Sequence, residues 1–201
     1  MSAVKKQNRD LEFLYEIGTL RLIQRSWSRF QSTDFQNLAE HHMRVIWIAL
    51  IIAAHEKVKN TEKVVKLALM HDIAESRTGD VDYLSRQYVE RNEKLGINDM
   101  IAKTVLEKEF LTLWKEYDQK KSVEAKIVKD ADNLDVDMEL REHEFRGHRV
   151  VEGWKEHREK VVKNRFYTQT ARNLWDAIQT SNPHDWHYKG RNRFNSGDWK
   201  E

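Results

Sequence analysis

The 201-residue chain contains no cysteine, only one proline and only seven glycines. Without cysteine it can form neither a disulfide nor a thiolate metal site, so a metal would need histidine, carboxylate or water ligands. Proline and glycine interrupt helices, and their scarcity leaves few points at which a helix must stop. No segment alternates apolar and polar residues as a half-buried strand does. We therefore expect an all-α fold.

The chain also has little net charge and no long apolar run. Its 35 Lys and Arg residues nearly balance 33 Asp and Glu residues, which is typical of a mixed-charge surface rather than of a nucleic-acid binder. The longest apolar run, residues 45–54, is too short to span a membrane, and no apolar signal core follows the first residues. We expect a cytoplasmic protein, with neither a membrane nor nucleic acid as a partner.

A chain of this length normally folds as one domain with a sizeable core, so we expect a single domain over residues 1–201. The tail at residues 183–201 differs in character, because aromatic residues lie among basic ones. We expect this tail to pack against the helices or to contribute to a dimer contact. The apolar periodicity predicts helices at residues 11–25, 38–58, 61–75, 83–95, 98–119, 122–144 and 151–180.

The doublet His71-Asp72 is the most informative local feature, because it ends the apolar segment at residues 64–70. Both side chains continue apolar stripes of the expected helix and should therefore face the interior. Glu75 follows His71 by four residues and lies on the same face. A carboxylate in that position can orient or deprotonate a water molecule beside a metal.

Two other expected helices place polar side chains in apolar rows. Asp132 has a valine four residues away on either side, and a buried carboxylate is costly unless a metal or a cation compensates it. Upstream, His41 and His42 both lie on apolar stripes, so periodicity does not choose between them. If the helices converge, one histidine of this pair would complete a nitrogen and oxygen site suited to Mn, Fe, Co, Ni or Zn. Its other ligands would be His71, Asp72 and Asp132.

The order of these residues resembles the H…HD…D signature of the HD-domain metal-dependent phosphohydrolases. The string HDIAESRTGD at residues 71–80 is similar to the HDxxExxxGD form of the 5′-deoxynucleotidase branch. The strings LAEH at residues 38–41 and KDADNL at residues 129–134 resemble the first and last ligand motifs of that branch. The match covers about residues 20–140 and favours His41 over His42. The implied metal ligands are His41, His71, Asp72 and Asp132.

The resemblance implies a helical HD-domain bundle with one divalent transition metal between helices, namely Mn, Co, Fe, Ni or Zn. It implies that Glu75 assists attack by a metal-bound water and that Asp80 helps to place this water or the substrate. The expected activity is that of a 5′-deoxynucleotidase, which releases phosphate from deoxynucleoside 5′-monophosphates. Two alternatives stay open: a dNTP triphosphohydrolase, and a metal-bearing nucleotide-binding or regulatory module without turnover. We expect a nucleotide substrate and a homodimer.

A second resemblance concerns the substrate. The string Arg25-Ser26-Trp27 is similar to an arginine and tryptophan pair that contacts phosphate and sugar in the bacterial enzymes of this branch. Trp27 lies fourteen residues before His41, which is the spacing of the family. Because Ser26 separates the pair here, either Arg25 or Arg29 could bind the phosphate. An arginine fork suits phosphate oxygens, and an indole ring can line the site of a sugar or base.

Overall fold

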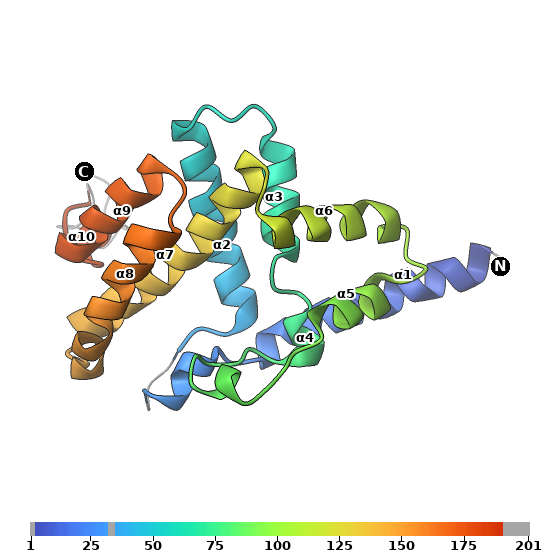
Figure 1. The fold of residues 1–201 in the computed structure, drawn as a ribbon, viewed down its shortest axis with the longest axis horizontal. Helices are drawn as coiled ribbons and strands as arrows, with labels where there is room; N and C mark the ends of the chain where they lie inside the picture. The colour runs from blue at the N-terminus through green and yellow to red at the C-terminus, as the bar shows by residue number, and fades with distance from the viewer. Residues whose placement is uncertain (1–2, 32–34, 191–201) are drawn as a thin grey trace, which may run out of the picture.

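The computed structural model describes residues 3–31 and 35–190. Within these ranges the chain is helical and has no strand, which confirms the predicted all-α fold (Figure 1). An isolated β-bridge joins Gln24 and Asn37 ahead of the second helix. The α-helices are α1 (Ala3–Ile17), α2 (Leu38–His55), α3 (Thr61–Met70), α4 (Glu75–Thr78), α5 (Glu93–Ile101), α6 (Glu107–Gln119), α7 (Val123–Phe145), α8 (Lys155–Arg165), α9 (Gln169–Thr180) and α10 (Asp185–Tyr188). The 3₁₀ helices are η1 (Gly18–Leu22), η2 (Ser26–Arg29), η3 (Ser85–Gln87) and η4 (Arg149–Trp154).

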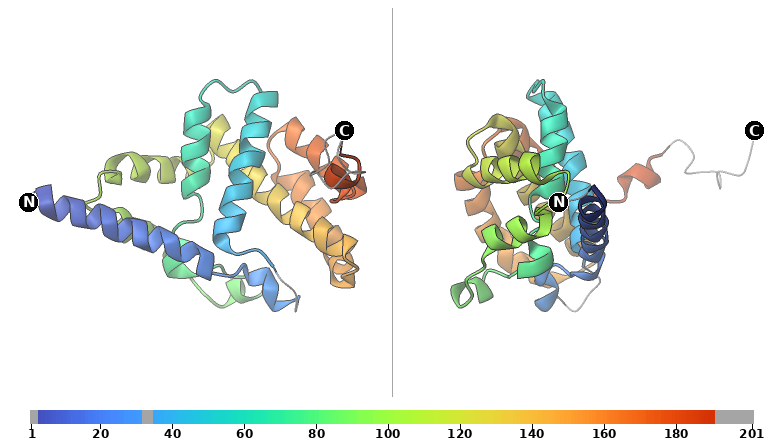
Figure 2. Two further views of the ribbon diagram at one scale, coloured as in Figure 1. Left: turned by 180° about the vertical axis from the view of Figure 1, so that it is seen from behind. Right: turned by 90° about the vertical axis from the view of Figure 1, so that its right-hand side faces the viewer.

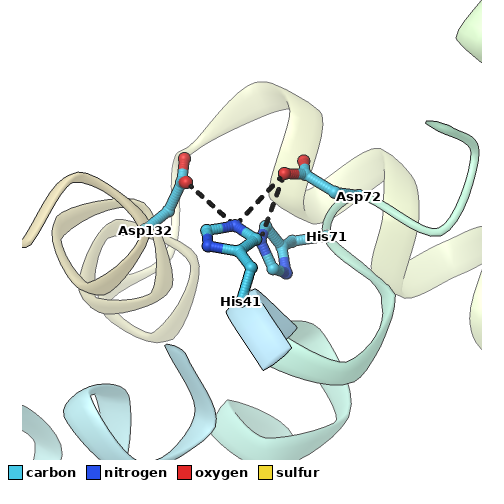
Figure 3. A group of neighbouring side chains, drawn as sticks. All are labelled: His41, His71, Asp72 and Asp132. Carbon is cyan, nitrogen blue, oxygen red and sulfur yellow. Dashed lines mark hydrogen bonds and ion pairs between the residues drawn. The ribbon is translucent and has the colours of Figure 1, made fainter. Parts of the chain in front are cut away.

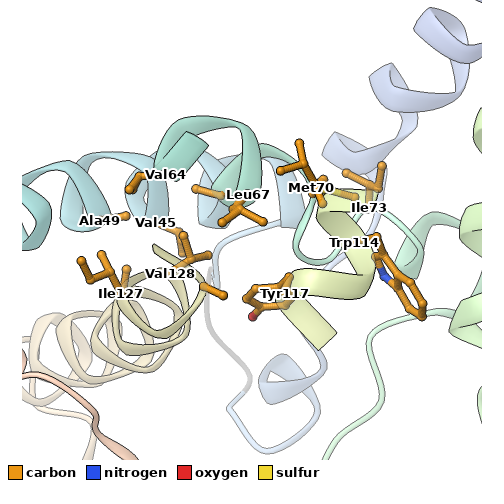
Figure 4. Packing of buried hydrophobic residues seen from close by; sticks show 14 of the residues in the cluster. Val45, Ala49, Val64, Leu67, Met70, Ile73, Trp114, Tyr117, Ile127 and Val128 are labelled. Atoms are coloured by element: carbon orange, nitrogen blue, oxygen red, sulfur yellow. The ribbon is translucent and has the colours of Figure 1, made fainter. Parts of the chain in front are cut away.

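Helices α2, α3 and α7 form the centre of the molecule, and α7 packs against both of the others and against α9 (Figure 1). Each of the three begins at a polar side chain that accepts a backbone N–H: Asn37, Asn60 and Ser122. Their facing apolar stripes build the core, in which Leu67 and Ile127 are fully buried (Figure 4). Burial of one such side chain contributes about 1.5–3 kcal/mol to stability. The core thus fixes the relative positions of three helices.

The remaining helices lie around this centre. Helix α1 extends along one end of the molecule beside α5, whereas α9 and α10 lie at the opposite end (Figures 1 and 2). Helix α6 packs on α3 and α7, and α8 follows the 3₁₀ helix η4. Across residues 3–31 and 35–190, no helix is both long and apolar enough to cross a membrane. Of the predicted tail, residues 191–201 lie outside the described residues.

Several predicted helices end earlier or break where polar groups compete with the helix. The segment predicted at 61–75 ends as α3 at Met70, and a turn separates it from α4. Of the segment predicted at 83–95, residues 85–87 form η3 and residues 93–95 belong to α5. Helix α5 begins after Asn92, whose side chain accepts the N–H of Leu95. Gly96, which lies between the predicted helices 83–95 and 98–119, is inside α5. Irregular backbone therefore surrounds the doublet His71-Asp72.

The last long segment, predicted as one helix at 151–180, divides into η4, α8 and α9. The break lies at Phe166–Thr168, where the buried carboxylate of Asp130 accepts the backbone N–H groups of Tyr167 and Thr168. The side chain of Thr168 then caps α9. A carboxylate on α7 thus holds the break between two later helices, which apolar periodicity along the chain does not reveal.

Candidate metal centre

Three helices each present a polar side chain at one point of the core. Helix α2 carries His41, α7 carries Asp132, and His71 and Asp72 follow directly after the last residue of α3 (Figure 3). One ligand atom from each of the four lies within 4.8 Å of all the others. The end of α3 allows adjacent residues to reach one point, because the backbone there leaves the regular helix. The structure therefore brings together the four residues predicted as metal ligands.

The spacing of the ligand atoms suits one metal ion. The Nε2 atoms of His41 and His71 lie 3.1 Å apart. Asp72 Oδ2 lies 3.3 Å from His71 Nε2 and 3.5 Å from His41 Nε2, and Asp132 Oδ1 lies 3.4 Å from His41 Nε2. Ligands about 2.1 Å from a tetrahedral ion would stand roughly 3.4 Å apart. Four of the six ligand pairs thus lie near the distance that a single ion requires, and the other two lie within 4.8 Å.

Hydrogen bonds at the far side of each imidazole direct the metal-binding nitrogen inward. His71 Nδ1 donates to the backbone carbonyl of Ala68 at 2.8 Å, and His41 Nδ1 donates to Asp135 Oδ2 at 2.5 Å. With Nδ1 protonated, the neutral ring keeps a lone pair on Nε2. Two lone pairs and two carboxylates then converge, an arrangement that a cation stabilises. Outer partners of this kind are typical of metal-binding histidines.

The charge balance also favours a cation at this point. Burial and the charge of Arg25 lower the pKa of His41, but hydrogen bonds with Asp132, Asp135 and Asp72 outweigh them and raise this pKa to about 10. Burial opposes the ionised form of Asp72, yet the charge of His71 and the hydrogen bond with His41 hold the pKa of Asp72 well below its usual range. Positive charge therefore stabilises the four side chains. A divalent ion can supply it in place of a proton.

The two carboxylate oxygens of Asp132 face different partners. Its Oδ1 faces His41, whereas Oδ2 accepts a hydrogen bond from Lys129 Nζ at 2.6 Å. The lysine offsets part of the charge and orients the carboxylate without occupying the oxygen that faces the other ligands. The donor set of two imidazoles and two carboxylates contains no sulfur, so it suits the transition metals expected from the sequence. The residues present therefore fit a divalent metal.

A polar cavity of about 310 Å³ opens beside the four ligands. This volume lies at the lower end of the range usual for small-molecule pockets. His71, Asp72 and Asp132 reach its wall, and so does Glu75. Basic side chains lie on several sides of it, as a site for an anion requires. They are Arg25, Arg86, Arg91, Lys120, Lys129 and Arg158.

Glu75 is the first residue of α4, and it is only 4% exposed. Its Oε1 accepts a hydrogen bond from Arg91, while its Oε2 is buried and has no hydrogen-bond partner among the described residues. Burial and the charges of Asp72 and Asp80 raise the pKa of Glu75 to about 9. A divalent ion at the four ligands would oppose this effect and favour the carboxylate. Oε2 is thus the oxygen of Glu75 that the described residues leave unpaired.

The structure places the two candidate arginines differently. Arg25 is buried beside the metal ligands, with Nη1 at 3.7 Å from Asp72 Oδ2 and Nε at 3.5 Å from Asp80 Oδ2. Arg29 is half exposed and donates to Asp82 at 3.2 Å and to Ser85 at 2.7 Å. Only Arg25 of this pair lines the cavity.

Asp80 and Trp27 complete the wall near Arg25. Asp80 Oδ2 accepts the backbone N–H of Ser26 at 3.0 Å and so holds the start of η2. Gly79 precedes it with a φ of 74°, a left-handed conformation that glycine adopts without strain. The ring of Trp27 packs edge-on against Trp154, with centroids 4.9 Å apart. Asp80 therefore positions the segment that carries Arg25 and Trp27.

The histidines that were not expected to bind metal occupy other positions. His42 is buried beside His71, with ring centroids 4.5 Å apart, and does not join the ligand cluster. His143 is buried and stacks on Phe35, with ring centroids 5.0 Å apart. His157 is exposed at the edge of the cavity.

Sequence reasoning missed three polar residues at the site. Asp135 lies one turn after Asp132 on α7, and it binds Arg44 and Gln36 as well as His41. The spacing between Asp132 and Asp135 can be read from the sequence, but the apolar pattern did not mark Asp135 as a residue of the site. Arg91 and Arg158 reach the cavity from a loop and from α8, outside every motif. Only the tertiary fold brings them there.

The fold and the four side chains define a class of protein: an all-α chain with nitrogen and oxygen atoms that suit a metal between three helices and a carboxylate beside them. A family model described as HD domain matches residues 17–181. The chain therefore belongs to the HD domain family, and the resemblance inferred from its ordered motifs is confirmed.

Known proteins share both sequence and fold with this chain. It is 33% identical over 140 residues to 5′-deoxynucleotidase HDDC2 of Danio rerio, covering 67% of this chain and 69% of that protein. It is 29% identical over 145 residues to the Homo sapiens protein of that name, covering 69% and 70%. A conserved hypothetical protein from Pyrococcus furiosus matches with a TM-score of 0.68 at 25% identity, over 84% of this chain and 96% of that one. A predicted metal-dependent phosphohydrolase from Magnetospirillum magnetotacticum shares the fold, with a TM-score of 0.68 at 20% identity, over 87% and 91%.

Asp135→Asn should weaken metal binding about 10- to 100-fold, because the neutral amide no longer polarises the His41 ring. Equilibrium dialysis of Mn²⁺ or Zn²⁺ against the chelated protein measures the change. Asp130→Asn is the matched control, since Asp130 is equally buried on α7 but binds the backbone at Tyr167 and Thr168. It should lower thermal stability and leave metal affinity unchanged. Wild-type metal affinity in folded Asp135→Asn would contradict the role of Asp135.

Proposed function

We propose that the protein is a metal-dependent 5′-deoxynucleotidase, which hydrolyses deoxynucleoside 5′-monophosphates to deoxynucleoside and phosphate. The names of the curated relatives support this activity, and they align with about two thirds of the chain. The four-ligand cluster and the polar cavity supply a place for the metal and for one small anion. The volume of the cavity suits a mononucleotide.

The proposal rests mainly on one observation, the unpaired Oε2 atom of Glu75. This atom is buried beside the metal ligands, and no side chain or backbone group of residues 3–31 and 35–190 hydrogen-bonds to it. Leaving a buried carboxylate oxygen unpaired costs about 1–3 kcal/mol or more. A protein that only stored a metal would gain nothing from such an atom. A hydrolase needs it, because attacking water must lose a proton to a nearby acceptor.

The residues of the cavity then take complementary roles. Glu75 accepts the proton of the attacking water through Oε2, and the buried guanidinium of Arg25 offsets charge on the phosphate. The ring of Trp27 lines the place of the sugar or base. When bound, a divalent metal lowers the pKa of water and offsets charge on the phosphoryl oxygens. The bond from water oxygen to phosphorus forms as the bond to the 5′ oxygen breaks. The 5′ oxygen takes up a proton from solvent, and Glu75 returns the proton of the attacking water to solvent, so that deoxynucleoside and phosphate are the products.

One observation favours the second candidate, a dNTP triphosphohydrolase. Lys120 and Lys129 both line the cavity, and two further cations would help to neutralise a longer phosphate chain. Products distinguish the two activities. With Mn²⁺ or Co²⁺ supplied, the proposed enzyme releases inorganic phosphate from dAMP and leaves dATP intact. Release of triphosphate from dATP, without hydrolysis of dAMP, would establish the second activity instead.

Glu75→Gln should lower kcat for dAMP about 10²- to 10⁴-fold, because the amide cannot accept the water proton. Metal content, measured by elemental analysis, should stay at the wild-type level, since Glu75 is outside the ligand cluster. The control is Glu109→Gln, which removes a surface carboxylate that pairs with Lys66 away from the cavity. Full activity of the Glu75 variant with metal supplied would show that the proposed proton acceptor is wrong.

The homodimer and the cytoplasmic location expected from the sequence stay predictions. For the homodimer, α2 leaves an apolar stripe exposed, on which Met43, Trp47 and Ile51 are 60%, 62% and 48% exposed. Residues four apart lie on one helical face, so a second copy could cover all three at once. The molar mass in solution and cell fractionation check these two expectations.

A further inference from the structure

Arg91 reaches the cavity from the loop that precedes α5, one residue before the capping residue Asn92. Its side chain is 15% exposed. Nη1 donates to Glu75 Oε1 at 2.8 Å and to the carbonyl oxygen of Gly79 at 3.2 Å. Nη2 lies 2.6 Å from Glu93 Oε1. One guanidinium therefore joins the start of α4, the turn before Asp80 and the start of α5.

The contact makes the two oxygens of Glu75 unequal. Oε1 is held by Arg91, whereas Oε2 is buried without a hydrogen-bond partner in the described part of the chain. Glutamate has a long side chain with several rotatable bonds, and α4 has only four residues, so this short helix alone does little to fix the carboxylate. The charge-assisted bond to Arg91 selects one orientation. In that orientation Oε2 is left unpaired among the described residues, and Glu75 lines the cavity.

The contacts of Arg91 differ from those of Arg25, the buried arginine that also lines the cavity. Both terminal nitrogens of Arg91 are already engaged by protein oxygens at 2.6–3.2 Å. Arg25 lies 3.5 Å and 3.7 Å from its nearest carboxylate oxygens, and its buried Nε has no hydrogen-bond partner within residues 3–31 and 35–190. Arg25 thus retains donors for a phosphate. Arg91 directs both of its terminal nitrogens at protein oxygens.

We propose that Arg91 is a positioning residue for Glu75, which holds the carboxylate so that Oε2 meets the attacking water. The inference rests on the proposed function, because it acts through the proton acceptor named there. Arg91 itself touches neither the phosphate nor the metal. Loss of Arg91 lets the carboxylate rotate, and a small displacement of a reacting group is enough to slow a reaction strongly.

Arg91→Met should lower kcat for dAMP about 10- to 100-fold, since misplacement of a catalytic group costs up to about that much. KM should stay within about threefold, because substrate contacts are unchanged. Arg91→Lys should restore kcat to within about fivefold of wild type, since one ammonium donor can still reach Oε1. The matched control is Arg77→Met, which removes an arginine paired with Glu16 outside the cavity. It should hydrolyse dAMP at the wild-type rate.

A binding experiment separates positioning from substrate contact. The binding of dAMP is measured in the inactive Glu75→Gln background with Mn²⁺ present. Adding Arg91→Met should change the dissociation constant by no more than about twofold, because Arg91 does not contact the substrate. Weakening of tenfold or more would make Arg91 a phosphate ligand and overturn the inference. The same result is read from Arg91→Lys if circular dichroism shows that the methionine variant does not fold.

The two proposals fail in different ways. If Glu75→Gln hydrolyses dAMP like the wild type, the proposed function loses its proton acceptor. If Glu75→Gln is inactive while folded Arg91→Met keeps the wild-type kcat, only the positioning role of Arg91 is wrong. If Arg91→Met lowers kcat and Arg91→Lys restores it, the proposed function and the positioning role of Arg91 are both supported.

Discussion

Two imidazole nitrogens that face each other at 3.1 Å, with two carboxylates beside them, are the constraint on which the rest of the structure depends. Neither nitrogen can turn away, because the other nitrogen of His71 donates to a backbone carbonyl and that of His41 donates to Asp135. The result is a cluster of lone pairs and carboxylates at the wall of a polar cavity. Positive charge stabilises this cluster, and a divalent cation can supply it in place of a proton.

The packed helices hold the four candidate ligands in place. The fully buried core between α2, α3 and α7 fixes three backbones that are far apart in sequence (Figure 4). Helix α3 ends at Met70, and the irregular backbone after it directs His71 and Asp72 toward the same place. The next turns, held by Arg91 and Asp80, return the chain to the cavity. Stability and chemistry therefore depend on the same packed helices.

The all-α fold could be predicted from the scarcity of helix breakers. Periodicity directed Asp132 and the doublet His71-Asp72 toward the interior, whereas the choice of His41 over His42 came from the resemblance to the HD-domain family. Asp132 stands in an apolar row, and His71 ends one. Asp135 shows no such pattern, since its partners are other polar groups rather than apolar neighbours. Arg91 reaches its place through a loop, whose path periodicity does not describe. The choice of Arg25 over Arg29 likewise depends on how η2 packs against the turn at Asp80.

The position of a bound metal tests the central claim most directly. Crystals soaked in Zn²⁺ and measured above the zinc absorption edge should give an anomalous peak about 2.0–2.2 Å from Nε2 of His41 and His71 and from one oxygen each of Asp72 and Asp132. Glu75 should lie near this peak without binding it. Absence of a peak at the four ligands, or a peak bound by His42 in place of His41, would contradict the account.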